Sequence, residues 1–201
     1  MEKPADTHFP IHDLLSRRWS PRAFAERPVE PEKIQRVLEA ARWASSCFNE
    51  QPWVFIIATV DQPAEHNKLL SCLVEGNQVW AKRAPLLMIT VAKQHFDHNG
   101  QPNRHAFHDV GLAVGNLVVQ ATDMDLVVHQ MAGILPEAIR ECFSLPSGYE
   151  PVTGIAIGYP GDLTTLPEEI RERERAPRSR KALQDFVFAE TWGQNPEFLL
   201  R

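Results

Sequence analysis

The sequence predicts a layered protein that contains both helices and strands. Four apolar runs of strand length recur along the chain, at 53–60, 85–91, 126–130 and 152–159. Several segments between them carry apolar residues at the i, i+3, i+4 and i+7 spacing of amphipathic helices. Strands that alternate with such helices favour two or three packed layers around a hydrophobic core.

The composition is that of an ordinary globular domain. Of the 201 residues, 43% are hydrophobic and 23% are charged. This length is sufficient for a substantial core, so we expect a single domain over 1–201, with 190–201 as a C-terminal arm. The net charge of −5 and the isoelectric point of about 5.9 argue against a nucleic-acid partner.

The cysteines and the N-terminus indicate a cytoplasmic location. Cys47, Cys72 and Cys142 are odd in number and widely spaced, which favours reduced thiols over disulfides or metal ligands. The first residues lack the apolar core of a signal peptide, and the apolar runs are too short to span a bilayer. His105 and His108 have a plausible ligand spacing but no carboxylate–cysteine set nearby, so we predict no metal site.

The first half of the chain is expected to contain three helices and one strand. Residues 9–18 form a short amphipathic helix, and 31–45 form a longer one with Pro31 in its first turn. The run 53–60 is a strand because it is apolar and rich in β-branched and aromatic residues. Residues 64–74 form a third helix, which the Gly76-Asn77-Gln78 segment is expected to end.

The strongest helix is predicted at 104–124, after a strand at 85–91 and an exposed loop at 95–104. Four consecutive apolar residues in that strand indicate burial on both faces. The helix carries a wide apolar stripe: Phe107, Val110, Gly111, Val114, Leu117, Val118 and Ala121. Two glycines, Gly111 and Gly115, favour close approach of another helix, although the stripe is equally compatible with the domain's own core. Asp109 is expected to cap or solvate this helix.

The last third of the chain alternates short elements and ends in an apolar tail. The expected elements are a strand at 126–130, a turn at 131–133, a helix at 136–143, a strand at 152–159, a charged helix or loop at 168–175 and an amphipathic segment at 182–188. The tail contains Trp192, Phe198, Leu199 and Leu200. Such a terminus needs an apolar surface to pack on, and a partner subunit is the natural place.

A short polar connection joins the second helix to the first strand. Pro52 disfavours helical backbone at the residue before it, so the helix must end there. The polar residues of this connection are Ser45, Ser46, Asn49 and Gln51. Connections between buried elements are where a scaffold presents ligand-binding groups, although simple helix-breaking chemistry also explains this pattern.

Two arginine clusters suggest that an anion is bound. The first is Arg17-Arg18-Trp19-Ser20-Pro21-Arg22, and the second is Arg178-Ser179-Arg180. The guanidinium group is a planar fork of donors that matches phosphate oxygens. Solvated basic loops are the alternative for each cluster alone.

Two segments together resemble the FMN-dependent nitroreductase family. They are Arg18-Trp19-Ser20-Pro21-Arg22-Ala23-Phe24 and, after the next helix, Ser45-Ser46-Cys47-Phe48-Asn49-Glu50-Gln51-Pro52-Trp53. Their order and spacing match, and the resemblance covers nearly the whole chain. It implies an α+β, nitroreductase-type three-layer fold, a central mixed sheet flanked by helices, with arms exchanged in a homodimer.

The resemblance also implies a set of cofactor-binding residues. Arg18, Trp19, Ser20 and Arg22 match the segment that holds the FMN phosphate and the pyrimidine edge, and Arg178 and Arg180 match a pair that grips the phosphate. The loop that reaches the flavin, partly from the other subunit, corresponds to Ser46, Cys47, Asn49 and Gln51. Ser45 and Cys47 depart from the usual proline and serine, which puts a Cys47 side-chain contact in doubt.

Further matches concern the flavin ring. Met131, Ala132 and Gly133 match a turn whose backbone N–H, here that of Ala132, points at flavin N5, while Gly133 permits close approach. Asn77 matches a residue at the ring edge. Trp80 stands where some members have lysine, so it shapes the substrate pocket or packs in the core. His129 is expected to be a satisfied core residue or to lie near the flavin.

The implied activity is that of an FMN-dependent oxidoreductase. NADH or NADPH would serve as co-substrate, and the acceptor would be a small electron-poor molecule, nitroaromatic, quinone or enone, in a ping-pong mechanism. No side chain is assigned a catalytic role. The alternatives are a flavin-binding sensor or storage protein without turnover, and a reductive dehalogenase or a flavin-destroying enzyme of the same fold.

Overall fold

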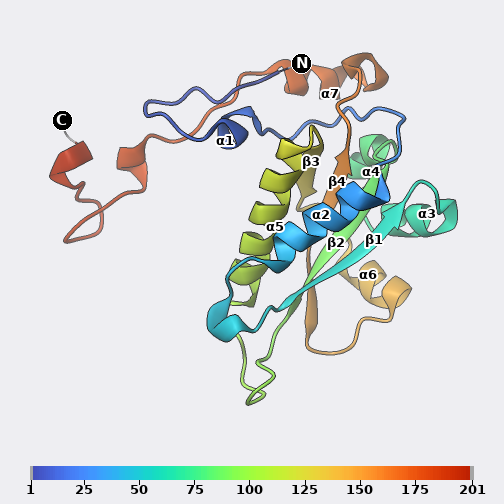
Figure 1. The fold of residues 1–201 in the computed structure, drawn as a ribbon, viewed down its shortest axis with the longest axis horizontal. Helices are drawn as coiled ribbons and strands as arrows, with labels where there is room; N and C mark the ends of the chain where they lie inside the picture. Colours follow the sequence, from blue (N-terminus) through green and yellow to red (C-terminus); the bar gives the residue numbers. More distant parts are fainter. Residues whose placement is uncertain (1, 200–201) are drawn as a thin grey trace.

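A four-stranded sheet lies at the centre of the computed structural model, which describes residues 2–199 (Figure 1). The strands are hydrogen bonded in the order β1 (Trp53–Thr59), β2 (Leu86–Lys93), β4 (Tyr149–Gly158) and β3 (Val127–Met131). Every neighbouring pair is antiparallel. The expectation of a mixed sheet is therefore wrong for the described strands.

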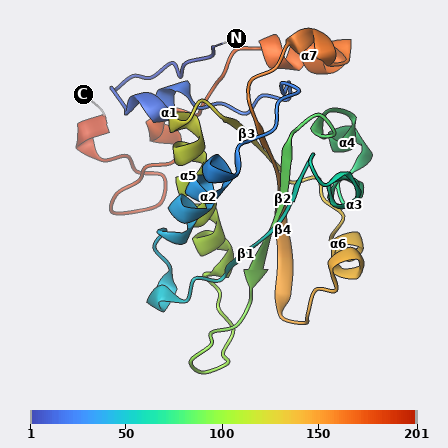
Figure 2. The same ribbon diagram turned by 45° about the vertical axis from the view of Figure 1, so that its right-hand side comes forward.

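Helices cover both faces of the sheet, which confirms the three-layer α+β arrangement (Figure 2). One face packs on α2 (Pro31–Arg42) and α5 (Ala106–Asp123). The other face packs on α3 (Pro63–Ser71), α4 (Glu75–Ala81) and α6 (Pro136–Phe143). Strand β2 is buried along nearly its whole length, as predicted, and its side chains alternate between the two cores.

The remaining elements lie at the ends of the chain. Helix α1 (Asp13–Arg17) is shorter than the predicted 9–18 helix, whereas α6 and α7 (Glu168–Arg175) match their predicted ranges. Short 3₁₀ turns occupy Cys47–Asn49, Leu163–Thr165, Leu183–Asp185 and Glu197–Leu199. None of the helices within residues 2–199 is both long enough and apolar enough to cross a membrane.

The prediction that Gly76-Asn77-Gln78 ends a helix is wrong, because these residues lie inside α4. This helix is stabilised by tertiary packing, since Trp80 is only 1% exposed and contacts the core under β2. Helices α3 and α4 connect the end of β1 to the start of β2, which lies at the same end of the sheet. Strand β2 therefore runs antiparallel to β1, with Thr59 opposite Leu86.

The apolar stripe of α5 divides between two environments. Val110, Val114, Leu117, Val118 and Ala121 are buried in the chain's own core, mainly against α2 and the sheet. Phe107 and Gly111 instead lie on an exposed face together with Leu112 and Gly115. Beta carbons built at the two glycines meet no atom within 4 Å, so this face has room for a close neighbour.

The C-terminal segment leaves the body of the molecule after α7 and extends along the side that carries α1 (Figures 1 and 2). Its aromatic residues are not covered, since Trp192 is 93% exposed and Phe198 is 71% exposed. Leu200 and Arg201, part of the predicted apolar tail, lie outside the described residues. Of the amphipathic segment 182–188, only a 3₁₀ turn forms.

Candidate functional site

Two arginine segments that are distant in sequence meet in a polar pocket of about 270 Å³ beside α7. We call it the basic pocket. It is lined by Lys3, Arg18, Trp19, Ser20, Arg22, Arg173, Glu174, Ala176, Pro177, Arg178 and Arg180. The structure thus brings all the predicted residues of both arginine segments together, as their proposed convergence on one anion requires.

The arginines of the basic pocket repel one another. Burial lowers the pKa of Arg18, and the charges of Arg178 and Arg180 lower it further. Burial and the charge of Arg180 likewise lower the pKa of Arg178. Within residues 2–199, no carboxylate forms an ion pair with these three side chains, and Arg18 donates to the Ser20 hydroxyl at 3.3 Å. A bound anion would relieve this repulsion.

Arg22 has a different environment, because its charge is compensated by a buried carboxylate. Glu174 is only 2% exposed, and its two oxygens accept hydrogen bonds from Arg22 Nη1 at 2.7 Å and from the Arg22 backbone N–H at 3.0 Å. The guanidinium lies 5.9 Å from the centre of the Trp80 ring. Arg22 therefore lines the basic pocket as a compensated cation and also lies beside Trp80.

The N-terminal segment closes one side of the basic pocket. Lys3 Nζ donates to the carbonyls of Glu174, at 2.6 Å, and Ala176. Arg178 in turn donates to the carbonyls of Lys3, at 2.5 Å, and Ser16, at 2.9 Å. Nothing in the sequence pattern of the first six residues predicts this role. The inward position of Glu174 could have been predicted, because Ile170 lies one turn earlier in α7 and packs against the core.

An aromatic wall extends from the basic pocket toward α4. The Trp80 ring lies 4.6 Å from the His129 ring and 6.2 Å from the Phe24 ring. His129 Nδ1 donates to the Pro21 carbonyl at 3.1 Å. Burial, followed by the nearby charge of Arg22, lowers the pKa of His129 to about 4, so its imidazole is neutral at pH 7.

Asn77, the predicted ring-edge residue, lies one helical turn before Trp80 in α4. Asn77 Nδ2 donates to the Gly133 carbonyl at 3.0 Å, which joins α4 to the turn of Met131, Ala132 and Gly133. A beta carbon at Gly133 would lie 2.6 Å from both Asn77 Nδ2 and Val74 Cγ2. A side chain at residue 133 would clash with Val74 and Asn77, so the close packing of this turn on α4 requires glycine.

The loop of Ser46, Cys47, Asn49 and Gln51 does not join this group within one chain. It lies at the opposite end of α5 from α1 and the basic pocket (Figure 1). Phe48, Asn49 and Gln51 have φ values of 52°, 57° and 51°, in the left-handed region that such residues seldom adopt. The loop is held by the Gln51 N–H, which donates to Ser46 Oγ at 3.0 Å.

Two carboxylates, one on α5 and one within the loop, tie the loop to its neighbours. Asp109 Oδ2 accepts from the Cys47 N–H at 3.0 Å, so the expectation that Asp109 caps or solvates its helix is wrong. Glu50 accepts from the Asp97 N–H at 2.7 Å, which ties the loop to the hairpin near residues 95–102. Both carboxylate side chains are shielded from water. No group of three or more potential metal ligands lies together within residues 2–199.

A family model and a solved structure both match most of this chain. The model of the Nitroreductase family matches residues 15–73 and 60–159. A solved structure described as an oxidoreductase containing FMN is 35% identical, with a TM-score of 0.89, and the match covers 94% of this chain and 96% of that one.

Two curated relatives are similar over most of their length. The major NAD(P)H-flavin oxidoreductase of Aliivibrio fischeri is 27% identical over 90% of this chain and 98% of its own. The FMN reductase [NAD(P)H] of Bacillus subtilis is 27% identical over 79% of this chain and 70% of its own.

His129 makes the stability of the protein depend on pH. Because its pKa is about 4 in the folded state and 6.5 in the unfolded state, the unfolded state binds more protons between these values. The free energy of unfolding should therefore rise with pH in this window through His129 and stay level above it. Replacing His129→Gln should remove this contribution. Urea unfolding of both proteins from pH 4 to 8 measures it, and a wild-type–variant difference that is constant with pH would contradict it.

Proposed function

The chain belongs to the nitroreductase family, and we propose that it is an FMN-dependent oxidoreductase that uses NADH or NADPH to reduce small electron-poor molecules. The observation that carries the proposal is the meeting of Arg18 with Arg178 and Arg180 in the basic pocket. Arg18 lies 160 residues before Arg178 in the sequence. Burial and then the charges of Arg178 and Arg180 lower the pKa of Arg18. A phosphate group is the ligand that such a cluster fits.

The other residues of the group fit the rest of FMN. Ser20 and Trp19 lie beside Arg18 and would meet the ribityl chain next to the phosphate. Arg22, held by Glu174, presents a fixed guanidinium toward Trp80 and would donate to the pyrimidine edge of the ring. Asn77 and the Ala132–Gly133 turn, joined by the hydrogen bond from Asn77 to the Gly133 carbonyl, would border the ring on its other side.

FMN, when bound, supplies the hydride chemistry of the reaction. The chain's own contribution is to bind, to orient and to exclude water. The N–H of Ala132 would donate to the ring nitrogen that is protonated in the reduced form. His129 stays neutral at pH 7, so it adds no positive charge beside Arg22.

We propose that the active unit is a homodimer with shared sites. The Ser46–Gln51 loop, with Cys47 and Asn49, lies far from the basic pocket of its own chain and would complete the site of a second copy. The exposed face of α5, with Phe107 and Leu112, and the uncovered residues of the arm 190–201 would form the interface. Apolar groups this large are seldom left in water in a monomer.

The acceptor is proposed to be a nitroaromatic, a quinone or an enone. It would occupy the same open face of the site as the nicotinamide, so the two would bind in turn, as in a ping-pong mechanism. A flavin-storing protein and a reductive dehalogenase remain as the alternatives.

Purified protein should be yellow, and acid should release FMN rather than FAD. With NADH or NADPH it should reduce a nitroarene or a quinone, with parallel double-reciprocal plots. Bound FMN without turnover of any acceptor would favour the storage alternative. Release of halide from an aromatic substrate would favour the dehalogenase. A colourless protein that cannot take up added FMN would contradict the proposal.

Arg18→Ala and Arg180→Ala should weaken FMN far more than riboflavin, which lacks the phosphate. A hydrogen bond to a charged group is worth about 1.5–3 kcal/mol, so the loss should be roughly ten- to a hundredfold for each arginine. Arg36→Ala, on the exposed side of α2, is the matched control and should change neither affinity. Fluorescence titration with both flavins measures this, and equal losses for both would show that these arginines do not contact phosphate.

Disrupting the proposed interface should release flavin together with the partner. Leu112→Glu on α5 and deletion of residues from Trp192 onward should both shift sedimentation toward monomer and weaken FMN in parallel. Ile57→Glu, an equally exposed apolar residue on the edge strand β1, is the control and should leave both unchanged. A monomer at micromolar concentration that holds FMN tightly and turns over would refute the shared site.

A further inference from the structure

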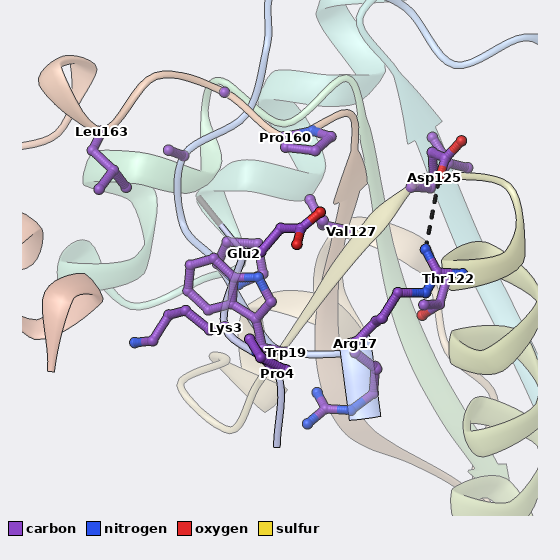
Figure 3. A pocket seen from close by; sticks show the side chains of 15 residues that line it. Glu2, Lys3, Pro4, Arg17, Trp19, Thr122, Asp125, Val127, Pro160 and Leu163 are labelled. Atoms are coloured by element: carbon purple, nitrogen blue, oxygen red, sulfur yellow. Dashed lines mark ion pairs between the residues drawn. The ribbon is translucent and has the colours of Figure 1, made fainter. Parts of the chain in front are cut away.

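A second cavity, of about 190 Å³, lies behind Trp19 and is not used by the proposed function (Figure 3). The N-terminal segment, the arginine segment, the end of α5, the start of β3 and the turn after β4 all contribute to its wall. Most of its lining is apolar: Pro4, Trp19, Pro21, Ala23, Leu126, Val127, Pro160 and Leu163. We call it the Trp19 cavity.

The size of the Trp19 cavity limits its ligand to a small molecule. An apolar cavity of about 150 Å³ in a protein interior holds a benzene molecule. The Trp19 cavity is somewhat larger, so one aromatic ring or a compact pair of rings fits and a nucleotide does not. The indole of Trp19 lines the space, as Figure 3 shows, and provides a flat face for stacking.

The lining of the Trp19 cavity contains one more cation than carboxylates. The cations are Lys3, Arg17 and Arg18, and the carboxylates are Glu2 and Asp125.

Two of these cations are already engaged. Arg17 pairs with Asp13 at 2.6 Å and lies 3.9 Å from Asp125, the pair marked in Figure 3. Lys3 is bound to backbone carbonyls and lies over the Trp19 ring. Arg18, whose described hydrogen bond is to the Ser20 hydroxyl, is the cation with donors to spare.

We propose that the Trp19 cavity binds an aromatic carboxylate of one or two rings, with its ring against Trp19 and Val127 and its carboxylate on Arg18. Because Arg18 also lines the basic pocket, such a ligand and a phosphate group compete for one guanidinium. By linkage, each weakens the other by the same factor. The competition part of the proposal rests on the proposed function, whereas the cavity's ligand does not.

Calorimetry with 2-naphthoate tests the site, with 2-naphthylmethanol as the neutral analogue. The full-length protein is titrated in saturating riboflavin, which leaves Arg18 free of phosphate. One naphthoate should bind per chain, about tenfold more tightly than the neutral analogue, as expected for one charge-assisted hydrogen bond. In saturating FMN the naphthoate affinity should fall by about the same factor.

Cavity-filling and charge variants separate this site from adventitious binding. Val127→Phe should weaken both probes, whereas Val54→Phe, the same change on the exposed side of β1, should weaken neither. Arg18→Ala should remove the preference for naphthoate over the alcohol. If Val127→Phe does not fold, Leu163→Trp fills the cavity from the opposite wall.

Unchanged binding in the filled variants, or a preference that survives Arg18→Ala, would overturn the proposal. A protein that takes up no flavin would still give a clear answer, because the naphthoate titration in riboflavin does not depend on flavin binding. Binding that is specific but insensitive to FMN would keep the ligand site and reject the competition for Arg18.

Discussion

The ion pair between the buried Glu174 and the partly exposed Arg22 is the interaction on which the arrangement of the site depends. It joins the segment before β1 to α7, 152 residues later, through two hydrogen bonds to one carboxylate. Removing Arg22 would leave the buried Glu174 carboxylate without compensation, at a cost that approaches the roughly 3–5 kcal/mol of a fully buried pair. Lys3 binds the backbone of the same turn of α7, so the N-terminal segment depends on this pair too.

Glu174 also makes Arg22 differ in charge compensation from the other arginines of the basic pocket. A carboxylate inside a cationic pocket would weaken anion binding if it neutralised every guanidinium. It compensates only Arg22, which is thereby directed to the aromatic wall of Trp80. Arg18, Arg178 and Arg180 form no ion pair within residues 2–199, and their proximity lowers the pKa of Arg18. The pocket thus combines the compensated Arg22 with uncompensated arginines whose repulsion a bound anion would reduce.

The sequence predicted the elements whose pattern is local and missed those that depend on distant contacts. The apolar run of β2 and the ranges of α6 and α7 agree with the structure, because burial on both faces and capping prolines leave direct signals. Helix α4 was missed because Gly76 disfavours it locally, while the burial of Trp80 stabilises it. The prediction of a mixed sheet was wrong for β1 and β2, because α3 and α4 return the chain to the end of the sheet where β1 finishes and β2 must then run antiparallel to it. The meeting of the arginine segments followed from resemblance, but no spacing rule places Lys3 there, and the helical spacing from Ile170 marks only the inward face of Glu174 and not its partner Arg22.

The strained loop at Ser46–Gln51 is the strongest argument that one chain is not the whole site. Left-handed backbone at Phe48, Asn49 and Gln51 costs free energy, and hydrogen bonds to Asp109 and Glu50 fix the loop on α5 and on residue 97. Within its own chain the loop is remote from the basic pocket and presents Phe48 to water. Strain that is maintained without a use in the same chain points to a use in another. If the second copy supplies this loop, flavin binding and dimerisation are linked equilibria, and each stabilises the other by mass action.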